Sequence, residues 1–119
     1  MRRFLAVTYL WVLAVPVALN ILGAGLNQAV LIANHDSFPV MVNSRSAETH
    51  GGVDAAGFLD DIHVAMTSAT HLNWLADIFD FKDGIYSPGD MLLELAEFLW
   101  SFAPIVWCTL IIRRLWEFA

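Results

Sequence analysis

Two long apolar runs enclose a more polar middle in this chain. The first run, residues 4–22, reads FLAVTYLWVLAVPVALNIL and contains no charged residue. The second begins near residue 88 and continues, with few charges, to Ile112. Each run is close to the ~20 residues that an α-helix needs to cross ~30 Å of hydrocarbon. The pattern therefore predicts an all-α membrane protein, with two membrane-spanning helices packed as an antiparallel hairpin.

The second helix has a recognisable start in SPGD, residues 87–90. Ser87 can cap the helix, Pro88 suits its first position, and Asp90 can return a hydrogen bond to the backbone of the cap. The negative charge of Asp90 also suits the first turn of a helix. We therefore expect the helix to run from about Pro88 to residue 116.

The first apolar run is followed by GAGLNQAVLIA, residues 23–33. This stretch is either a straight extension of the first helix or a separate piece in the membrane interface, and we favour the extension. Asn34 would then end the helix, because asparagine tolerates the left-handed backbone conformation found after many helices. Residues 37–42 would return as extended chain, because Phe38 precedes a proline.

The polar middle of the chain covers residues 34–87. Apolar residues recur at helical spacing over residues 53–66 and again over residues 70–79, which predicts two short helices. The polar stretch at 42–52 ends in two glycines and is typical of a mobile loop. The middle is therefore expected to be a small, mainly helical segment.

Charge is distributed unevenly along the chain. Four of the six basic residues flank the apolar runs: Arg2, Arg3, Arg113 and Arg114. Nine of the twelve acidic residues fall between residues 34 and 90. Because Lys and Arg favour the cytoplasmic side of a membrane, we expect an integral protein of the cell (inner) membrane with both termini cytoplasmic. A cleaved signal peptide is the alternative, although its apolar region usually spans only ~7–15 residues.

These patterns divide the chain into three parts. Residues 1–33 form the first transmembrane helix with its extension, residues 34–87 form an acidic segment outside the cell membrane, and residues 88–119 form the second transmembrane helix and the cytoplasmic end. Hydrophobic residues make up 58% of the chain and its mean hydropathy is +0.60, against ~45–50% hydrophobic residues in soluble domains.

The charge balance also limits the partners of the protein. The net charge is −6, and nucleic-acid binding needs a clustered basic face that this sequence lacks. We expect the lipid bilayer to surround the protein, and a protein partner or a second copy of the chain to bind it. No intrachain disulfide is possible, because Cys108 is the one cysteine.

Polar residues within the apolar runs suggest a polar seam between the two helices. Counted from the basic ends, Asn20 and Glu97 lie at similar depth, and Glu94 shares the face of Glu97. A carboxylate within hydrocarbon usually faces a partner or the interior of a helical bundle. We therefore expect Asn20, Glu94 and Glu97 to form either an interhelical hydrogen-bonded contact, which we favour, or a path for an ion or proton.

The histidines and carboxylates of the middle segment raise the question of a metal site. The set His35, Asp36, Asp61 and His63 could bind zinc or another divalent ion. The sequence contains no H-x3-H or C-x2-C pair, so hydrated surface histidines are the simpler interpretation. It also contains no G-x-S-x-G motif and no nucleophile with an evident base. We expect no cofactor and no enzymatic activity.

Three stretches together resemble a known family. They are LIANHDSFPVMVN at 31–43, THLNWLADIF at 70–79 and IYSPGDMLLELAEF at 85–98. In this order they are similar to the A-N-x-x-x-P-V, L-A/G-D and S-x-G-D elements of a family of small uncharacterised membrane proteins of prokaryotes and phages. In that family two glycines follow the A-N pair, and in this chain His35 and Asp36 stand in their places. The resemblance implies a membrane protein, prompts the idea of a phage-encoded one, and transfers no functional residue.

Three functions are compatible with these features. A non-enzymatic interaction module that modifies the cell envelope is the preferred one, because it needs only the charge asymmetry and the polar seam. A holin-like pore protein is the second, motivated by small size and by Asn20 and Glu97 within the membrane, although residues 34–87 form a large outer segment for such a protein. A metal-dependent membrane enzyme that uses the outer histidines is the third.

Overall fold

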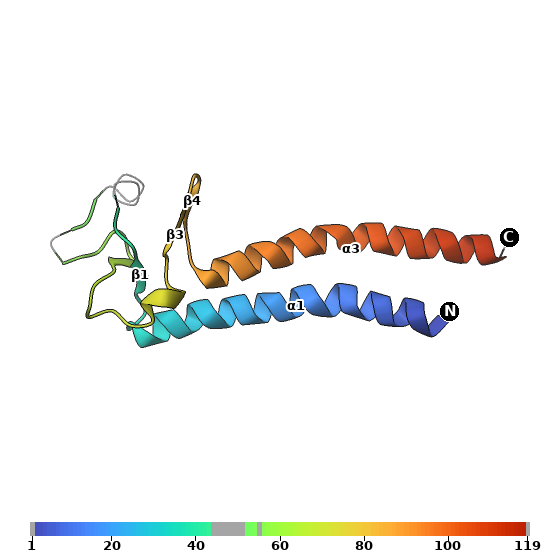
Figure 1. The fold of residues 1–119 in the computed structure, drawn as a ribbon, viewed down its shortest axis with the longest axis horizontal. Coiled ribbons are helices and arrows are strands. Elements are labelled where there is room, and N and C mark those ends of the chain that lie inside the picture. The colour runs from blue at the N-terminus through green and yellow to red at the C-terminus, as the bar shows by residue number, and fades with distance from the viewer. Residues whose placement is uncertain (1, 44–51, 55, 119) are drawn as a thin grey trace.

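Two long helices lie side by side and give the molecule the shape of a rod (Figure 1). The structure, a computed structural model, describes residues 2–43, 52–54 and 56–118. Helix α1 spans Arg2–Ala33 and helix α3 spans Pro88–Phe118. The helices run in opposite directions, so both ends of the chain lie at one end of the rod and the intervening segment lies at the other (Figure 1). The molecule measures 71 × 26 × 19 Å.

Both helices form where the apolar runs predict them. α1 continues through residues 23–33 without a break, which is the arrangement that we favoured. Leu10–Ala33 has a mean hydropathy of 1.7 and Pro88–Glu117 one of 1.8, and both spans are long and apolar enough to cross a membrane. In the apolar window of each span only 11% of the positions are buried. Most of the apolar side chains therefore lie on the outside of the helix pair.

Short strands provide most of the regular structure between the two helices. In chain order the elements are β1 (Phe38–Val40), β2 (His63–Ala65), the 3-10 helix η1 (Asn73–Leu75), β3 (Phe79–Phe81) and β4 (Gly84–Tyr86). β1 pairs with β2 in parallel, and β3 pairs with β4 in an antiparallel hairpin. The prediction of a mainly helical segment is therefore wrong: of the described residues between α1 and α3, only η1 is helical. Most of the predicted mobile loop at 42–52 lies outside the described residues.

The helix predicted over residues 53–66 does not form, because polar side chains there hydrogen-bond to the local backbone. Asp54 Oδ1 accepts hydrogen bonds of 2.8 Å from the backbone N–H groups two and four residues later. Asp60 Oδ1 accepts similar bonds, of 3.0 and 2.8 Å, from the N–H groups two and three residues later. Such local bonds give the backbone an alternative to the helix, and Gly57 has a φ of 91°, which no right-handed helix contains.

The helix predicted over residues 70–79 shortens to η1 for a similar reason. Thr70 Oγ1 donates a hydrogen bond of 2.7 Å to Asn73 Oδ1, and Asn73 Nδ2 donates one of 3.0 Å to the carbonyl oxygen of Thr67. Leu72, just before η1, has a left-handed φ of 54°. These contacts build a compact polar turn that leaves room for a single helical turn.

α1 ends where the sequence predicts, but the left-handed conformation expected at Asn34 occurs at the next two residues instead. His35 and Asp36 have φ values of 54° and 65°. Asn34 acts through its side chain: Nδ2 donates to the carbonyl oxygens of Val30 at 2.9 Å and His71 at 2.8 Å, and Oδ1 accepts a bond of 2.7 Å from the N–H of His71. Asn34 thereby ties the end of α1 to the loop before η1. The extended chain that follows is β1, as predicted.

Small residues line much of the contact between α1 and α3. Buried positions recur every seventh residue, at Pro16, Gly23 and Val30 in α1 and at Gly89, Ala96 and Ala103 in α3. A seven-residue repeat keeps one face of each helix toward its partner, and small residues let the backbones approach closely. The approach is closest where Gly23 meets Gly89, since a Cβ atom on either residue would lie 2.7 Å from the carbonyl oxygen of the other.

A small apolar cluster attaches the intervening segment to the helix pair. Val30 of α1 packs with Phe38 of β1, Leu75 of η1 and Ala76, and all four side chains are buried. The cluster lies at the end of α1 remote from the termini. It therefore holds the segment between the helices against the end of α1.

Replacing Gly89 with alanine is expected to lower the free energy of unfolding by about 1–3 kcal/mol. The added Cβ would overlap Asn27 Oδ1 and lie 2.7 Å from the carbonyl oxygen of Gly23. Unfolding in detergent micelles, followed by circular dichroism, measures the change. Gly25→Ala is the matched control, because a Cβ there meets nothing within 4 Å. Equal stability of the two variants would contradict the close approach of the helices.

Candidate functional site

A reciprocal pair of hydrogen bonds begins α3. Ser87 Oγ accepts a bond of 3.0 Å from the N–H of Asp90, and Asp90 Oδ2 accepts a bond of 3.0 Å from the N–H of Ser87. This geometry is the capping box that SPGD predicts, and it confirms the predicted start of the helix. The carboxylate of Asp90 also lies at the positive end of the helix dipole, where negative charge is stabilising.

The side chain of Asn27 completes this cap from the neighbouring helix. Its Oδ1 accepts a hydrogen bond of 2.8 Å from Ser87 Oγ, and its Nδ2 donates one of 2.7 Å to Asp90 Oδ1. Ser87 is fully buried, and hydrogen bonds are stronger where water is excluded. We call these three residues, Asn27, Ser87 and Asp90, the polar joint.

The polar joint depends on the close approach of the helices at Gly23 and Gly89. With a side chain at position 89, the Cβ atom would take the place of Asn27 Oδ1. Glycine at that position therefore lets the amide of Asn27 reach the first turn of α3. The hydrogen bonds of Asn27 therefore depend on the close packing of the helices at Gly89.

Asp77 carries a buried carboxyl group within electrostatic reach of the polar joint. Its main chain bonds to residues in and after β1, since its N–H donates to the carbonyl oxygen of Pro39 at 3.2 Å and its carbonyl oxygen accepts from the N–H of Met41 at 2.9 Å. The residue is 8% exposed, and its Oδ1 has no hydrogen-bond partner. Burial, followed by the charge of Asp90, raises the pKa of Asp77 to about 7, although His63 acts in the opposite direction.

Asp60 and His63 form a hydrogen-bonded pair beside β1. His63 Nδ1 lies 2.7 Å from Asp60 Oδ2, and the His63 ring packs edge-on against Phe38, with 6.3 Å between ring centroids. Burial raises the pKa of Asp60, but hydrogen bonds from the N–H groups of Ile62 and His63, together with the His63 ring, outweigh it and hold the pKa below its usual range. The acidic partner of His63 is therefore Asp60, whereas the candidate metal set names Asp61.

The structure does not gather the candidate metal ligands into one site. His35 and Asp36 are exposed in the turn after α1, Asp61 is exposed, and His63 lies in β2. Within the described residues, no three His, Cys, Asp or Glu side chains are grouped so that they could hold a metal ion.

The predicted polar seam differs from the polar contact that the structure contains. Asn20 precedes Asn27 by seven residues and Glu97 follows Asp90 by seven, so the antiparallel helices place Asn20 and Glu97 at a similar level. Asn20 is half-buried, whereas Glu94 and Glu97 are exposed. In the described part of the chain no hydrogen bond joins Asn20 to either glutamate. Ala96, next to Glu97 in sequence, is fully buried, whereas the two glutamates lie on the exposed side of α3.

Asn27 and Asp77 are not among the predicted site residues, although the sequence carries a signal for each. Asn27 lies on the same helical stripe as Asn20 and Gly23, and the capping box marked the opposing helix end. Asp77 ends the L-A-D element, but neither its burial nor its neighbour Asp90 is visible in a local pattern. Both residues act through contacts with distant parts of the chain.

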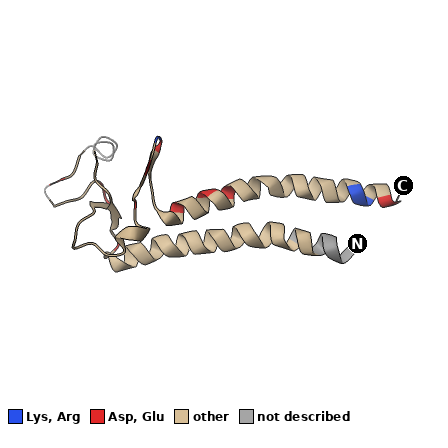
Figure 2. Ribbon diagram, in the orientation of Figure 1, with Lys and Arg blue, Asp and Glu red and all other residues tan. Residues whose placement is uncertain are grey.

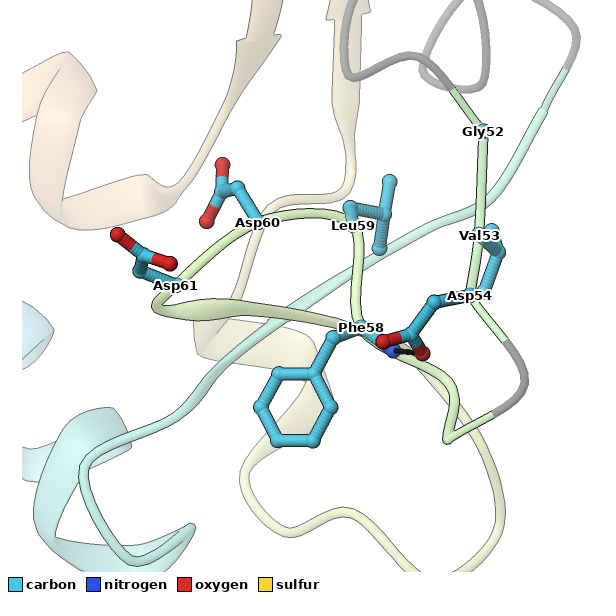
Figure 3. A pocket seen from close by; sticks show the side chains of 7 residues that line it. All are labelled: Gly52, Val53, Asp54, Phe58, Leu59, Asp60 and Asp61. Atoms are coloured by element: carbon cyan, nitrogen blue, oxygen red, sulfur yellow. Dashed lines mark hydrogen bonds between the residues drawn. The ribbon is translucent and has the colours of Figure 1, made fainter.

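A surface groove of about 510 Å³ lies apart from the polar joint (Figure 3). It is lined by Gly52, Val53, Asp54, Phe58, Leu59, Asp60 and Asp61. The carboxylates of Asp54 and Asp60 already bind backbone N–H groups there. Among these described lining residues there is no serine, threonine, cysteine or histidine, so the groove offers no nucleophile paired with a base. The polar joint, unlike the groove, brings side chains of both long helices into contact.

Replacing Asn27 with alanine is expected to lower the free energy of unfolding by about 1–3 kcal/mol, because Ser87 loses its buried acceptor and Asp90 a donor. Unfolding in detergent micelles measures the loss. Gln28→Ala, at the neighbouring exposed amide, is the control and should leave stability nearly unchanged. A loss as large for Gln28→Ala as for Asn27→Ala would show that the polar joint has no special part in stability.

Comparison with known proteins identifies the family but no function. No curated protein and no solved structure matches the chain. A family model described as a family of unknown function, DUF5317, matches residues 4–102. That range contains α1 from residue 4 onward, the whole intervening segment, the three residues of the polar joint and the first half of α3. It confirms the expectation of an uncharacterised family, and this chain belongs to DUF5317.

Proposed function

We propose that this protein is integral to the cell (inner) membrane, with α1 and α3 each crossing the bilayer. The observation that carries this proposal is the outer surface of the helix pair. Large apolar side chains are exposed along its length, among them Trp11, Ile21, Ile105 and Trp107 at 63%, 70%, 61% and 50%. Soluble monomers rarely expose apolar patches beyond a few hundred Å². Lipid is the solvent that such a surface suits.

The lengths of the helices support the same arrangement. With 32 and 31 residues, each is about 47 Å long at ~1.5 Å per residue. Hydrocarbon is ~30 Å thick and the whole bilayer ~40–45 Å. The helix ends would therefore reach the headgroups or beyond, and the polar joint would lie near the outer headgroups.

The charges suggest the orientation. Acidic residues gather on the intervening segment and on the first turns of α3, and basic residues lie near the other end of α3 (Figure 2). These basic residues are Arg113 and Arg114. Arg2 and Arg3 stand at the corresponding end of the chain. Under the positive-inside rule, both termini would be cytoplasmic and residues 34–87 outside.

Within this arrangement we propose a non-enzymatic interaction role in the cell envelope. The helix pair holds residues 34–87 in place through the polar joint and the apolar cluster around Val30. On that segment Trp74 is 68% exposed, and Phe79 and Phe81 are 39% and 45% exposed. Aromatic residues are enriched in protein interfaces, so this surface suits a protein partner or a second copy of the chain.

The orientation can be tested with single cysteines, because Cys108 is the one native cysteine. In a Cys108→Ser background, Asp83→Cys places a thiol at the exposed turn between β3 and β4, and Glu117→Cys places one near the other end of the rod. A membrane-impermeant maleimide is expected to label Asp83→Cys in intact cells, and Glu117→Cys only after the cells are permeabilised. Labelling of both thiols, or the reverse order, would overturn the topology.

The interaction role can be tested with a photoreactive phenylalanine analogue in native membranes. At position 74 it is expected to give a discrete protein adduct, because Trp74 is exposed on the intervening segment. At position 11 it is expected to give lipid adducts, because Trp11 lies on the apolar surface of α1. Absence of any protein adduct at position 74 would argue against the proposed interaction surface.

A further inference from the structure

Asp77 connects separate parts of the fold. Through its main chain it bridges Val40 of β1, and through electrostatics its side chain responds to Asp90 in the first turn of α3 and to His63 of β2. It directly follows Leu75 and Ala76 of the apolar cluster. A change at Asp77 therefore acts on the contact between the intervening segment and the helix pair.

The carboxyl group of Asp77 differs from neighbouring carboxyl groups in having a buried oxygen, Oδ1, with no hydrogen-bond partner. Asp54, Asp60 and Asp90 all accept hydrogen bonds from backbone N–H groups. Asp77 is more than nine-tenths buried, and its Oδ1 accepts none. Burying an ionised group without such bonds is strongly unfavourable, and a carboxyl group in this position binds a proton instead.

Of the charged groups around Asp77, Asp90 reinforces this preference and His63 opposes it. Asp90 faces it from α3 and carries the negative charge that already occupies the positive end of that helix. His63 faces it from β2, but its Nδ1 is held by Asp60 at 2.7 Å. β1, the third neighbouring element, consists of Phe38, Pro39 and Val40 and contributes no charge.

We propose that the Asp77 carboxyl group is a proton-binding site, and that loss of this proton loosens the packing of residues 75–77 against β1 and the end of α1. A proton fits this position better than a metal ion, because no group of three metal-ligating side chains exists among the described residues. The inference goes beyond the interaction role proposed above and does not depend on the identity of a partner.

The direction of the pH effect follows from the pKa. The folded protein raises the pKa of Asp77 from 3.8 to about 7, so between these values the folded state binds more protons than the unfolded state. The proton's contribution to stability is then fully present below pH 3.8, declines as the pH rises, and is lost above about pH 7. This packing should therefore be tightest in acid and loosest in alkali.

Hydrogen exchange measured by mass spectrometry on the full chain in detergent micelles tests the proposal. After correction for intrinsic exchange, opening at the N–H groups of Met41 and Asp77 should increase by up to about tenfold per pH unit between about pH 5 and pH 7, and level off near pH 8. Asp77→Asn, which cannot ionise, should show no such dependence. Asp61→Asn, at an exposed carboxyl group, should keep the wild-type dependence.

Two results would overturn the proposal: wild-type exchange that does not depend on pH, or an Asp77→Asn variant that keeps the wild-type dependence. If Asp77→Asn does not fold, infrared spectroscopy of the wild type decides. A carbonyl stretch from a protonated carboxyl group should be present near pH 6 and absent near pH 8, on either side of a pKa of about 7. Absence of that band near pH 6 would show that Asp77 is already ionised.

Discussion

The hydrogen-bonded contact of Asn27 with Ser87 and Asp90 determines how the two long helices meet. The side-chain amide of Asn27, on α1, hydrogen-bonds to both capping residues of α3. It therefore fixes the distance between the two helices and their relative position along the long axis. Gly23 and Gly89 are required by this contact, because any side chain at 89 would displace the amide. The small residues further along the helices, Ala96 and Ala103, continue the same close approach.

The segment between the helices is attached to the end of α1 rather than folded independently. Its strands are three residues long, and short two-stranded sheets are marginally stable in water. What holds them is the burial of Phe38 and Leu75 against Val30, and the side-chain bonds of Asn34 to the loop before η1. Asp77 is buried within the same region, which is why a single proton there can influence the whole attachment.

Local features of the sequence were sufficient for the helices but not for the segment between them. Continuous apolar runs and a capping box depend on residues within a few positions of one another, and both predictions are confirmed. The apolar spacing over residues 53–66 suggested a helix, but Asp54 and Asp60 bind the local backbone and β2 pairs with β1, which lies more than twenty positions earlier. At the candidate site, the depth of Asn20 and Glu97 along their helices can be counted from the sequence. The rotation of each helix about its own axis cannot, because it depends on how small residues such as Gly23 and Ala96 pack, and this rotation is what exposes Glu97.

The distance in sequence between Asn27 and its partner Asp90 also sets an order of events during synthesis. The two residues are 63 positions apart, and ribosomes add about 5–20 residues each second. For several seconds the amide of Asn27 has no partner from α3, and α1 must persist on its own helical hydrogen bonds. The intervening segment can pack on Val30 and Asn34 of α1 during that interval, whereas the polar joint forms only after the last helix begins.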